Sequence, residues 1–207
     1  MLDLKVHYVN KVPVAVLDNF FTEYEHNAIF DEITRMRMAG LLRPPEETGS
    51  ATHDDDSLKK VNSAVWFPHV YRIKEMSPTE MISPKLISPT VVNELINHDV
   101  MFRFLTNINS ASSLFSYYNN SDRYEAHTDT ATFTLLHWLY KEPKGFEGGD
   151  FIIEDKLSIE CKNNRVVYMP SFLEHAVTPV KLKGEPPWVD GWGRHTISHF
   201  LHGHMEV

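Results

Sequence analysis

The chain has 207 residues, of which 42% are hydrophobic, and a formal net charge of −8. This length and hydrophobic content are typical of one soluble domain with a sizeable core and exclude a disordered chain. The negative charge disfavours nucleic acid as a partner, because non-specific binding to nucleic acid needs a basic surface.

The location of the protein is predicted from three absences in the sequence. The N-terminus lacks a continuous apolar stretch after a basic start, which predicts no signal peptide. No window approaches 18 consecutive apolar residues, so no membrane span is predicted. The single cysteine, Cys161, allows no internal disulfide, and we expect it to be an inert buried thiol. We therefore expect a cytoplasmic protein.

The N-terminal part of the chain predicts a strand followed by a helix. Val12–Leu17 is short, apolar and rich in β-branched residues, as strands are. Thr22, with Glu25 three residues later, forms a capping-box pattern. Apolar residues at helical spacing follow, and Gly40 stands where a C-terminal cap belongs. These features predict a helix over residues 22–39.

A polar connection separates this helix from the next predicted elements. Residues 41–61 include two adjacent prolines and a run of acidic residues, and they are long for a structureless connection. We therefore expect a mobile lid that orders over the active site. Ser63–Phe67 predicts a strand, Pro78–Pro89 predicts turns or a short helix, and residues 91–106 predict further helix. Residues 1–110 are thus expected to form a helical support.

From residue 111 onward, short strand-like runs alternate with turn residues. The runs are Ser113–Tyr118, Tyr124–His127, Thr132–Tyr140, Phe151–Glu154, Leu157–Cys161, Arg165–Met169, His175–Val180 and Arg194–Leu201. Short strands at this spacing predict a sandwich or jelly roll over residues 111–207. Residues 186–193 interrupt the last gap and predict an inserted loop. The fold class is therefore mostly β with flanking helices (α+β), in a single domain.

A candidate metal site lies directly after one of these strand-like runs, at His127-Thr128-Asp129. Side chains at i and i+2 of a strand project to the same face, so an imidazole nitrogen and a carboxylate oxygen lie together. A second His would complete a two-His-one-carboxylate site with open metal positions, and His175 is our candidate. A second His-x-Asp motif, at His53, lies in polar sequence without a strand pattern and is predicted to be a solvated loop.

From Leu114 to Leu201 the chain resembles the Fe(II)/2-oxoglutarate-dependent oxygenases, and within them the prolyl 4-hydroxylase branch. The matching blocks follow in order: Tyr118–Tyr124, His127–Asp129, Phe133–Tyr140, Phe146–Phe151, His175–Val180 and Gly193–Leu201. Each block is a weak signal alone, and their order and spacing make the resemblance specific. It implies a double-stranded β-helix (jelly-roll) core with N-terminal helices packed on it.

The resemblance also implies an activity and its cofactors. By position, His127, Asp129 and His175 correspond to the family's iron ligands. The family uses Fe(II), with 2-oxoglutarate and O₂ as co-substrates, and ascorbate as a supporting reductant. A C–H bond of the substrate is hydroxylated, and succinate and CO₂ are released.

Four further positions carry implied roles. Arg194 corresponds to the residue that binds the far carboxylate of 2-oxoglutarate, which suits a guanidinium that can donate two parallel hydrogen bonds. Tyr118 and Thr134 correspond to co-substrate contacts, and Tyr124 to a wall of the pocket. In many relatives the basic residue follows the second His by about ten positions, where this chain has Glu185. We attribute the displacement to the inserted loop.

The substrate implied by the resemblance is a prolyl, or another, side chain of a protein or peptide. Trp138 and Tyr140 depart from this reading, because they stand where prolyl hydroxylases commonly have Tyr and Asn. Trp188 and Trp192 either flank a substrate groove or hold the inserted loop in place, and we favour the second role. The alternatives are a free amino acid or small metabolite as substrate, or a non-catalytic jelly-roll module that binds metal.

Several of the 12 histidines crowd the C-terminus. His195 and His199 share one face of the last predicted strand, opposite Arg194. We expect a half-exposed strand there, with a second metal site as the alternative.

Overall fold

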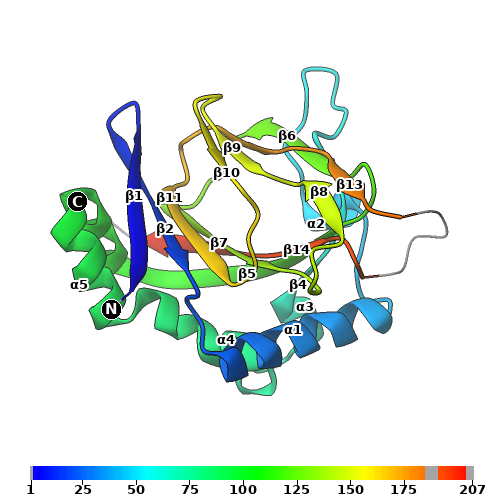
Figure 1. The fold of residues 1–207 in the computed structure, drawn as a ribbon, viewed down its shortest axis with the longest axis horizontal. Helices are drawn as coiled ribbons and strands as arrows, with labels where there is room; N and C mark the ends of the chain where they lie inside the picture. Colours follow the sequence, from blue (N-terminus) through cyan, green and yellow to red (C-terminus); the bar gives the residue numbers. More distant parts are fainter. Residues whose placement is uncertain (1, 185–190, 204–207) are drawn as a thin grey trace.

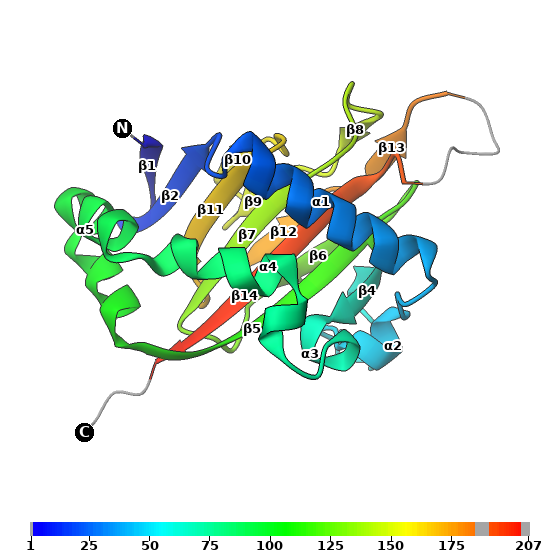
Figure 2. The same ribbon diagram turned by 90° about the horizontal axis from the view of Figure 1, so that it is seen from below.

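Two antiparallel β-sheets face each other, and helices cover the outer face of the larger sheet (Figure 1). The structure is a computed structural model that describes residues 2–184 and 191–203. Seen from below, α1 and α4 cross over the strands of the large sheet, whereas α5 lies at the end where β1 and β2 stand (Figure 2). This arrangement confirms the predicted double-stranded β-helix with helices packed on it.

The larger sheet has seven strands in the order β1-β2-β11-β7-β14-β5-β4. In chain order, these strands are β1 (Asp3–Val9), β2 (Val12–Asp18), β4 (Ser63–Trp66), β5 (Ile108–Tyr118), β7 (Phe133–Leu139), β11 (Arg165–Pro170) and β14 (Arg194–Gly203). β7 lies at the centre of the sheet, and all of its residues are buried. It pairs with β11 on one side and with β14 on the other.

The smaller sheet has five strands in the order β10-β9-β12-β6-β3, and a separate pair, β13-β8, extends the fold beside it. Its strands are β3 (Lys60–Val61), β6 (Arg123–His127), β9 (Phe151–Ile153), β10 (Leu157–Ile159) and β12 (His175–Val177). The separate pair consists of β8 (Phe146–Gly148) and β13 (Val180–Leu182). The edge strand β3 is the one that enters the sheet from the N-terminal half of the chain.

Helical segments precede β5. They are α1 (Glu23–Met38), α2 (Pro45–Thr48), α3 (Phe67–Val70), η1 (Lys74–Met76), α4 (Pro78–Ile82), η2 (Ser83–Ile87), α5 (Pro89–His98) and η3 (Val100–Asn107), where η denotes a 3₁₀ helix. The capping box predicted for α1 is present: the Thr22 hydroxyl accepts from the Glu25 amide, and the Glu25 carboxylate accepts from the Thr22 amide. Within the described chain, no helix is long and apolar enough to cross a membrane.

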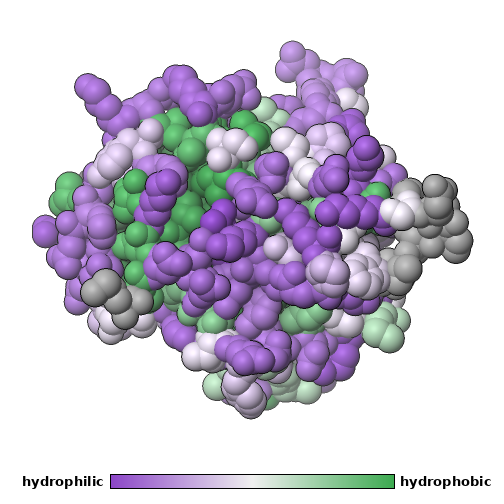
Figure 3. Space-filling view, viewed as in Figure 1, coloured by the Kyte–Doolittle hydropathy of each residue, from purple (hydrophilic) through white to green (hydrophobic). Residues whose placement is uncertain are grey.

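Two apolar clusters hold the layers together. The first fills the space between the helices and the large sheet, and it includes Ile29 and Ile33 of α1 together with Leu135 and Ile197 of the sheet. The second lies between the two sheets and includes Trp138 and Phe151. Hydrophobic surface gathers over β2 and β11, while most of the rest of the same face is hydrophilic (Figure 3). The second cluster, between the two sheets, supplies the apolar surroundings of the candidate site.

Several predicted boundaries were wrong for identifiable reasons. Strand β1 was not predicted, because its polar and charged residues hide an alternation that serves only to pair with β2. The predicted run 175–180 is two strands, since its ends pair with different partners, β9 and β6 for β12 and β8 for β13. Residues 41–61 are not structureless: they contain α2 and β3, and residues 43 and 52 form isolated bridges. The mobility of this segment stays a prediction.

Candidate active site

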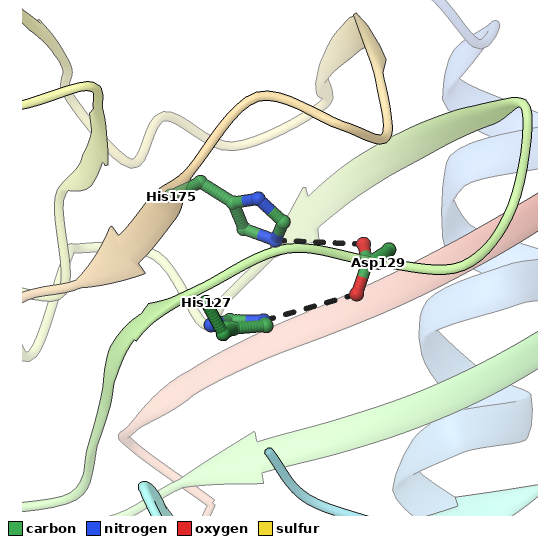
Figure 4. Close-up of side chains that lie close together, drawn as sticks. All are labelled: His127, Asp129 and His175. Atoms are coloured by element: carbon green, nitrogen blue, oxygen red, sulfur yellow. Dashed lines mark ion pairs between the residues drawn. The ribbon is translucent and has the colours of Figure 1, made fainter. Parts of the chain in front are cut away.

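The candidate ligands converge from two neighbouring strands of the small sheet. His127 ends β6, His175 begins β12, and the two residues lie opposite each other in the register. Asp129 follows β6 by two residues. Its Oδ1 lies 3.8 Å from His127 Nε2, and its Oδ2 lies 3.4 Å from His175 Nε2 (Figure 4). One ligand atom from each residue lies within 4.8 Å of the others, which is a geometry that a single metal ion can bridge.

The protonation of both imidazoles is set by backbone carbonyls. His127 Nδ1 lies 2.8 Å from the Glu125 carbonyl, and His175 Nδ1 lies 2.9 Å from the Leu173 carbonyl. A carbonyl oxygen only accepts, so each Nδ1 carries the proton and each Nε2 keeps a lone pair for a metal. Burial and the neighbouring His175 lower the pKa of His127 to about 4, which favours the neutral ligand form.

The Asp129 carboxylate is oriented by a short chain of hydroxyl groups. Thr134 Oγ1 donates to Asp129 Oδ2 at 2.6 Å. Thr134 has a single hydroxyl proton, and it donates this proton to Asp129. In the 2.9 Å hydrogen bond between the two hydroxyl groups, Ser171 Oγ is therefore the donor and Thr134 Oγ1 is the acceptor. Burial raises the pKa of Asp129, but hydrogen bonds and charge from His175, Thr134 and His127 hold it below its ordinary value. The carboxylate therefore stays ionised. A co-substrate contact by Thr134 stays a prediction.

Tyr124 connects the metal triad to the long N-terminal connection. Its ring stacks on His127 with a centroid distance of 3.5 Å and an interplanar angle of 15°. Its hydroxyl accepts a hydrogen bond from the Ala51 amide at 2.9 Å. Tyr124 also lines the cavity at the triad, as expected for a wall residue. One side chain thus fixes both the His127 ring and the position of residue 51.

Arg194 begins β14, on the opposite sheet from the two histidines, and is only 1% exposed. Its guanidinium lies 4.8 Å from the Tyr118 ring centroid and 5.4 Å from the Trp138 ring centroid. Among the described residues, no nitrogen or oxygen acceptor pairs with any of its three guanidinium nitrogens. The buried Cys161 thiol lies beside it, and burial raises the pKa of that thiol, so it carries no compensating charge. A buried cation in this state is set to receive an anion.

The triad and Arg194 line one cavity of about 260 Å³ between the sheets. Tyr118, Tyr124 and Thr134 line the same cavity, so all the predicted site residues meet there. Burial raises the pKa of Tyr118, which keeps its hydroxyl protonated as a possible donor.

Sequence reasoning missed two contributors to this site. Lys60 lines the cavity although it lies in the stretch predicted to be a lid. Ser171 supports Thr134 and also accepts the Asp129 amide proton at its carbonyl, at 3.0 Å. Ser171 follows a proline at a strand end and carries no periodic signal. Lys60 lies in the polar connection 41–61, where no sequence pattern marks it as a site residue.

Three further predictions have clear outcomes. His195 and His199 are buried, at 1% and 3% exposure, so the half-exposed strand was wrong. In the described part of the chain, the triad is the one group of three or more His, Cys, Asp or Glu side chains that could hold a metal, so the alternative of a second metal site at these histidines is not supported. His53 lies in an exposed loop, as predicted, and pairs with Glu125. Trp192 packs against Gly145 and Lys141, which fits a structural role, and Trp188 lies outside the described residues.

Comparison with known proteins shows that part of the chain matches a protein family. A model of the 2OG-Fe(II) oxygenase superfamily matches residues 113–202, which include the triad and Arg194. No curated protein matches the sequence.

Several solved structures share the fold. A prolyl hydroxylase from Trichoplax adhaerens, in complex with a hypoxia inducible factor oxygen degradation domain peptide fragment, is 15% identical, with a TM-score of 0.60 over 92% of this chain and 83% of that chain. A Pseudomonas putida prolyl-4-hydroxylase is 14% identical, with a TM-score of 0.56 over 93% of each chain. A 2OG-Fe(II) oxygenase family oxidoreductase from Burkholderia pseudomallei is 12% identical, with a TM-score of 0.53 over 92% of this chain and 85% of that chain.

The residues present fit the cofactors of this family. Two imidazoles and one ionised carboxylate suit Fe(II), and the unpartnered guanidinium in the same cavity suits the far carboxylate of 2-oxoglutarate. The match of residues 113–202 to the 2OG-Fe(II) oxygenase superfamily and this donor set together support a dioxygenase that uses Fe(II), 2-oxoglutarate and O₂.

Proposed function

We propose that this dioxygenase hydroxylates a prolyl side chain of a protein or peptide, with His127, Asp129 and His175 holding Fe(II) and Arg194 holding 2-oxoglutarate. When bound, the iron supplies the oxidising chemistry: one atom of O₂ enters the substrate C–H bond as hydroxyl, and the other enters succinate as CO₂ leaves. The observation that carries the assignment of a 2-oxoglutarate-dependent activity is the buried, unpartnered Arg194 guanidinium in the same cavity as the triad.

The residues of this chain would act by binding, orienting and excluding water. The carbonyls of Glu125 and Leu173 keep Nε2 of both histidines free for the metal. Thr134 aims the Asp129 carboxylate. The rings of Tyr118 and Trp138 pack around the Arg194 guanidinium, so its hydrogen bonds to a carboxylate would form away from water and gain strength. The side chains of the triad line the cavity, so a metal held there would be open to co-substrates and substrate.

The peptide substrate is supported by the fold and by the shape of the cavity. Two of the similar structures are prolyl hydroxylases, and one of them holds a peptide fragment. The cavity extends from the triad to Trp66 and Phe200, whose ring centroids lie 5.7 Å apart. Aromatic walls suit a pyrrolidine ring. Trp138 departs from the prolyl hydroxylase pattern but is fully buried between the sheets, where it serves Arg194 rather than the cavity wall.

A free amino acid or small metabolite is the second candidate, because a cavity of about 260 Å³ also fits a small ligand. Mass spectrometry distinguishes the two. Purified protein with Fe(II), ascorbate and 2-oxoglutarate is incubated with proline-containing peptides and, separately, with free L-proline. We expect a product heavier by about 16 Da, the mass of one oxygen atom, on peptide and one succinate for each hydroxylation. Product on L-proline alone, or on neither, would overturn the peptide assignment.

A further inference from the structure

Lys60 is a second buried cation in the cavity, and the proposed chemistry leaves it without a role. It lies on the edge strand β3, opposite Tyr124 in the register, and is 3% exposed. Its Nζ donates to Thr48 Oγ1 at 3.1 Å and lies 5.9 Å from the Tyr124 ring centroid. Within the described chain, no carboxylate forms an ion pair with it, and neither Thr48 nor Tyr124 is an ionised partner.

A lysine in this position is costly unless an anion joins it. An ammonium group has three donors, and here only one meets a hydrogen-bond acceptor. Removing an unpaired charge from water destabilises the folded protein, because the charge loses its hydration without gaining a partner. Consistent with this cost, burial lowers the pKa of Lys60 to about 8. Lys60 therefore remains mostly protonated near neutral pH and is ready to receive a negative charge.

The charged residues that line the cavity limit which anion could pair with Lys60. Asp129 is the one acidic residue among the lining residues, and it belongs to the metal triad. A 2-oxoglutarate molecule has two carboxylates: one would lie at the metal and the other at Arg194. Lys60 and Arg194 lie on opposite sheets. With both carboxylates of 2-oxoglutarate assigned in this way, the anion that would pair with Lys60 is still to be assigned.

We propose that Lys60 binds a carboxylate of the substrate, so that the enzyme selects peptides with an acidic residue next to the hydroxylated proline. This inference rests on the proposed function, because it assumes that 2-oxoglutarate occupies Arg194. The α-carboxylate of free L-proline offers the same chemistry and is a separate arm of the test. Lys60 lines the same cavity as the triad, and its Nζ lies 5.9 Å from the centroid of the Tyr124 ring that stacks on His127.

The first test measures binding at Lys60 without turnover. The Zn(II)-loaded protein, saturated with 2-oxoglutarate, is ¹³C-methylated at its lysines, and the Lys60 signal is assigned by its loss in Lys60→Met. Probes are peptides that differ only in Asp, Asn or Lys beside proline, and L-proline. We expect the Asp peptide to raise the apparent pKa of Lys60 above about 9, as a nearby opposite charge does, and the Asn peptide to leave it unchanged. The same pKa is also measured in Zn(II)-loaded protein without 2-oxoglutarate. If 2-oxoglutarate by itself raises the pKa of Lys60 and the Asp peptide raises it no further, Lys60 binds the co-substrate and the proposal is overturned.

The second test measures selectivity with the Fe(II) enzyme. We expect Lys60→Met to raise KM about 10- to 100-fold more for the Asp peptide than for the Asn peptide, as loss of a charge-assisted hydrogen bond does. The control is Lys181→Met, which removes an exposed lysine on β13.

Equal use of the Asp and Asn peptides by the unmodified enzyme overturns the role of Lys60 and leaves the prolyl assignment intact. A raised Lys60 pKa with no hydroxylated peptide or amino acid supports the carboxylate site and overturns the prolyl assignment. A response to L-proline alone assigns the α-carboxylate as the ligand.

Discussion

The hydroxyl of Thr134 donates a hydrogen bond that orients the Asp129 carboxylate beside the two histidines. It donates at 2.6 Å from a position that is 1% exposed, so water cannot replace it. We expect Thr134→Val to keep the fold and to weaken Mn(II) or Fe(II) affinity by about 10- to 100-fold, as loss of a partner that orients a metal ligand does. Competition with a fluorescent chelator measures this affinity. Thr134→Ser keeps the hydroxyl and should retain most of the affinity, and equal losses in both variants would contradict the role of the hydrogen bond.

Lys60 should make the stability of the protein depend on pH in a defined window. Burial lowers its pKa from 10.5 to about 8, so between these pH values the unfolded chain binds more protons than the folded protein. The contribution of Lys60 to the free energy of unfolding is therefore unfavourable below pH 8 and is relieved as pH rises toward 10.5. The full effect is about 3 kcal/mol, from about 1.4 kcal/mol for each pKa unit.

Urea denaturation of metal-free protein tests this dependence. Lys60→Met should be more stable than the unmodified protein at pH 7, and the difference should shrink toward pH 10. Lys181→Met, at an exposed position, should show no such trend. A Lys60→Met variant that is less stable at every pH would show that the lysine has a compensating partner in the folded state.

At the scale of elements, the segment between α1 and β4 is paired to the rest of the protein near its ends, whereas its middle is exposed. The Arg43–Ala64 and Thr52–Leu58 bridges and the short strand β3 tie it to the sheets. Between these bridges, residues 53–57 are exposed. The Ala51 amide is held by the Tyr124 hydroxyl, which directly couples this segment to the ring on His127.

Hydrogen exchange tests whether this segment closes over the substrate. We expect amides of residues 49–58 to exchange quickly in the free enzyme and to slow when 2-oxoglutarate and substrate bind, as closing lids do. Tyr124→Phe removes the acceptor for the Ala51 amide and should speed exchange there, while exchange at Ala64, which bonds to Arg43, stays slow. Protection of residues 49–58 in the free enzyme that does not change with ligands would contradict a lid.

At the scale of the whole molecule, the site spans both sheets. The two histidines belong to the small sheet, and Arg194 belongs to the large sheet. A 2-oxoglutarate molecule bound to the metal and to Arg194 would connect the two sheets. A ligand that binds only the folded state stabilises it, by about 2.7 kcal/mol at a hundred times its Kd.

Thermal unfolding measures this connection. With Mn(II) present, 2-oxoglutarate should raise Tm by about 5–10 °C in the unmodified protein, given about 2–4 °C per kcal/mol for a chain of this size. Arg194→Ala should keep the rise caused by Mn(II) and lose most of the rise caused by 2-oxoglutarate, while Arg194→Lys keeps part of it because the charge survives. A full 2-oxoglutarate response in Arg194→Ala would move the anchor to another cation, with Lys60 as the first candidate.

Much of the candidate site could be predicted because its signals are local. The i, i+2 spacing of His127 and Asp129 predicted that the two side chains lie together, and they do, although Asp129 lies just beyond the end of β6. The α1 cap at Thr22 depends on residues three apart, and the structure has both of its hydrogen bonds. The alternation of strands and turns after residue 111 likewise predicted the class of fold.

The sequence by itself thus determined the candidate metal ligands, the basic residue on the last strand and the jelly-roll class. Only the tertiary structure decided that Lys60 joins the cavity, that Ser171 supports Thr134, and that His195 and His199 are buried. These facts depend on pairings between residues far apart in the chain, such as β3 with β6 and β7 with β11. Strand periodicity states which residues share a face, but the partner that covers this face is chosen by packing of the whole chain.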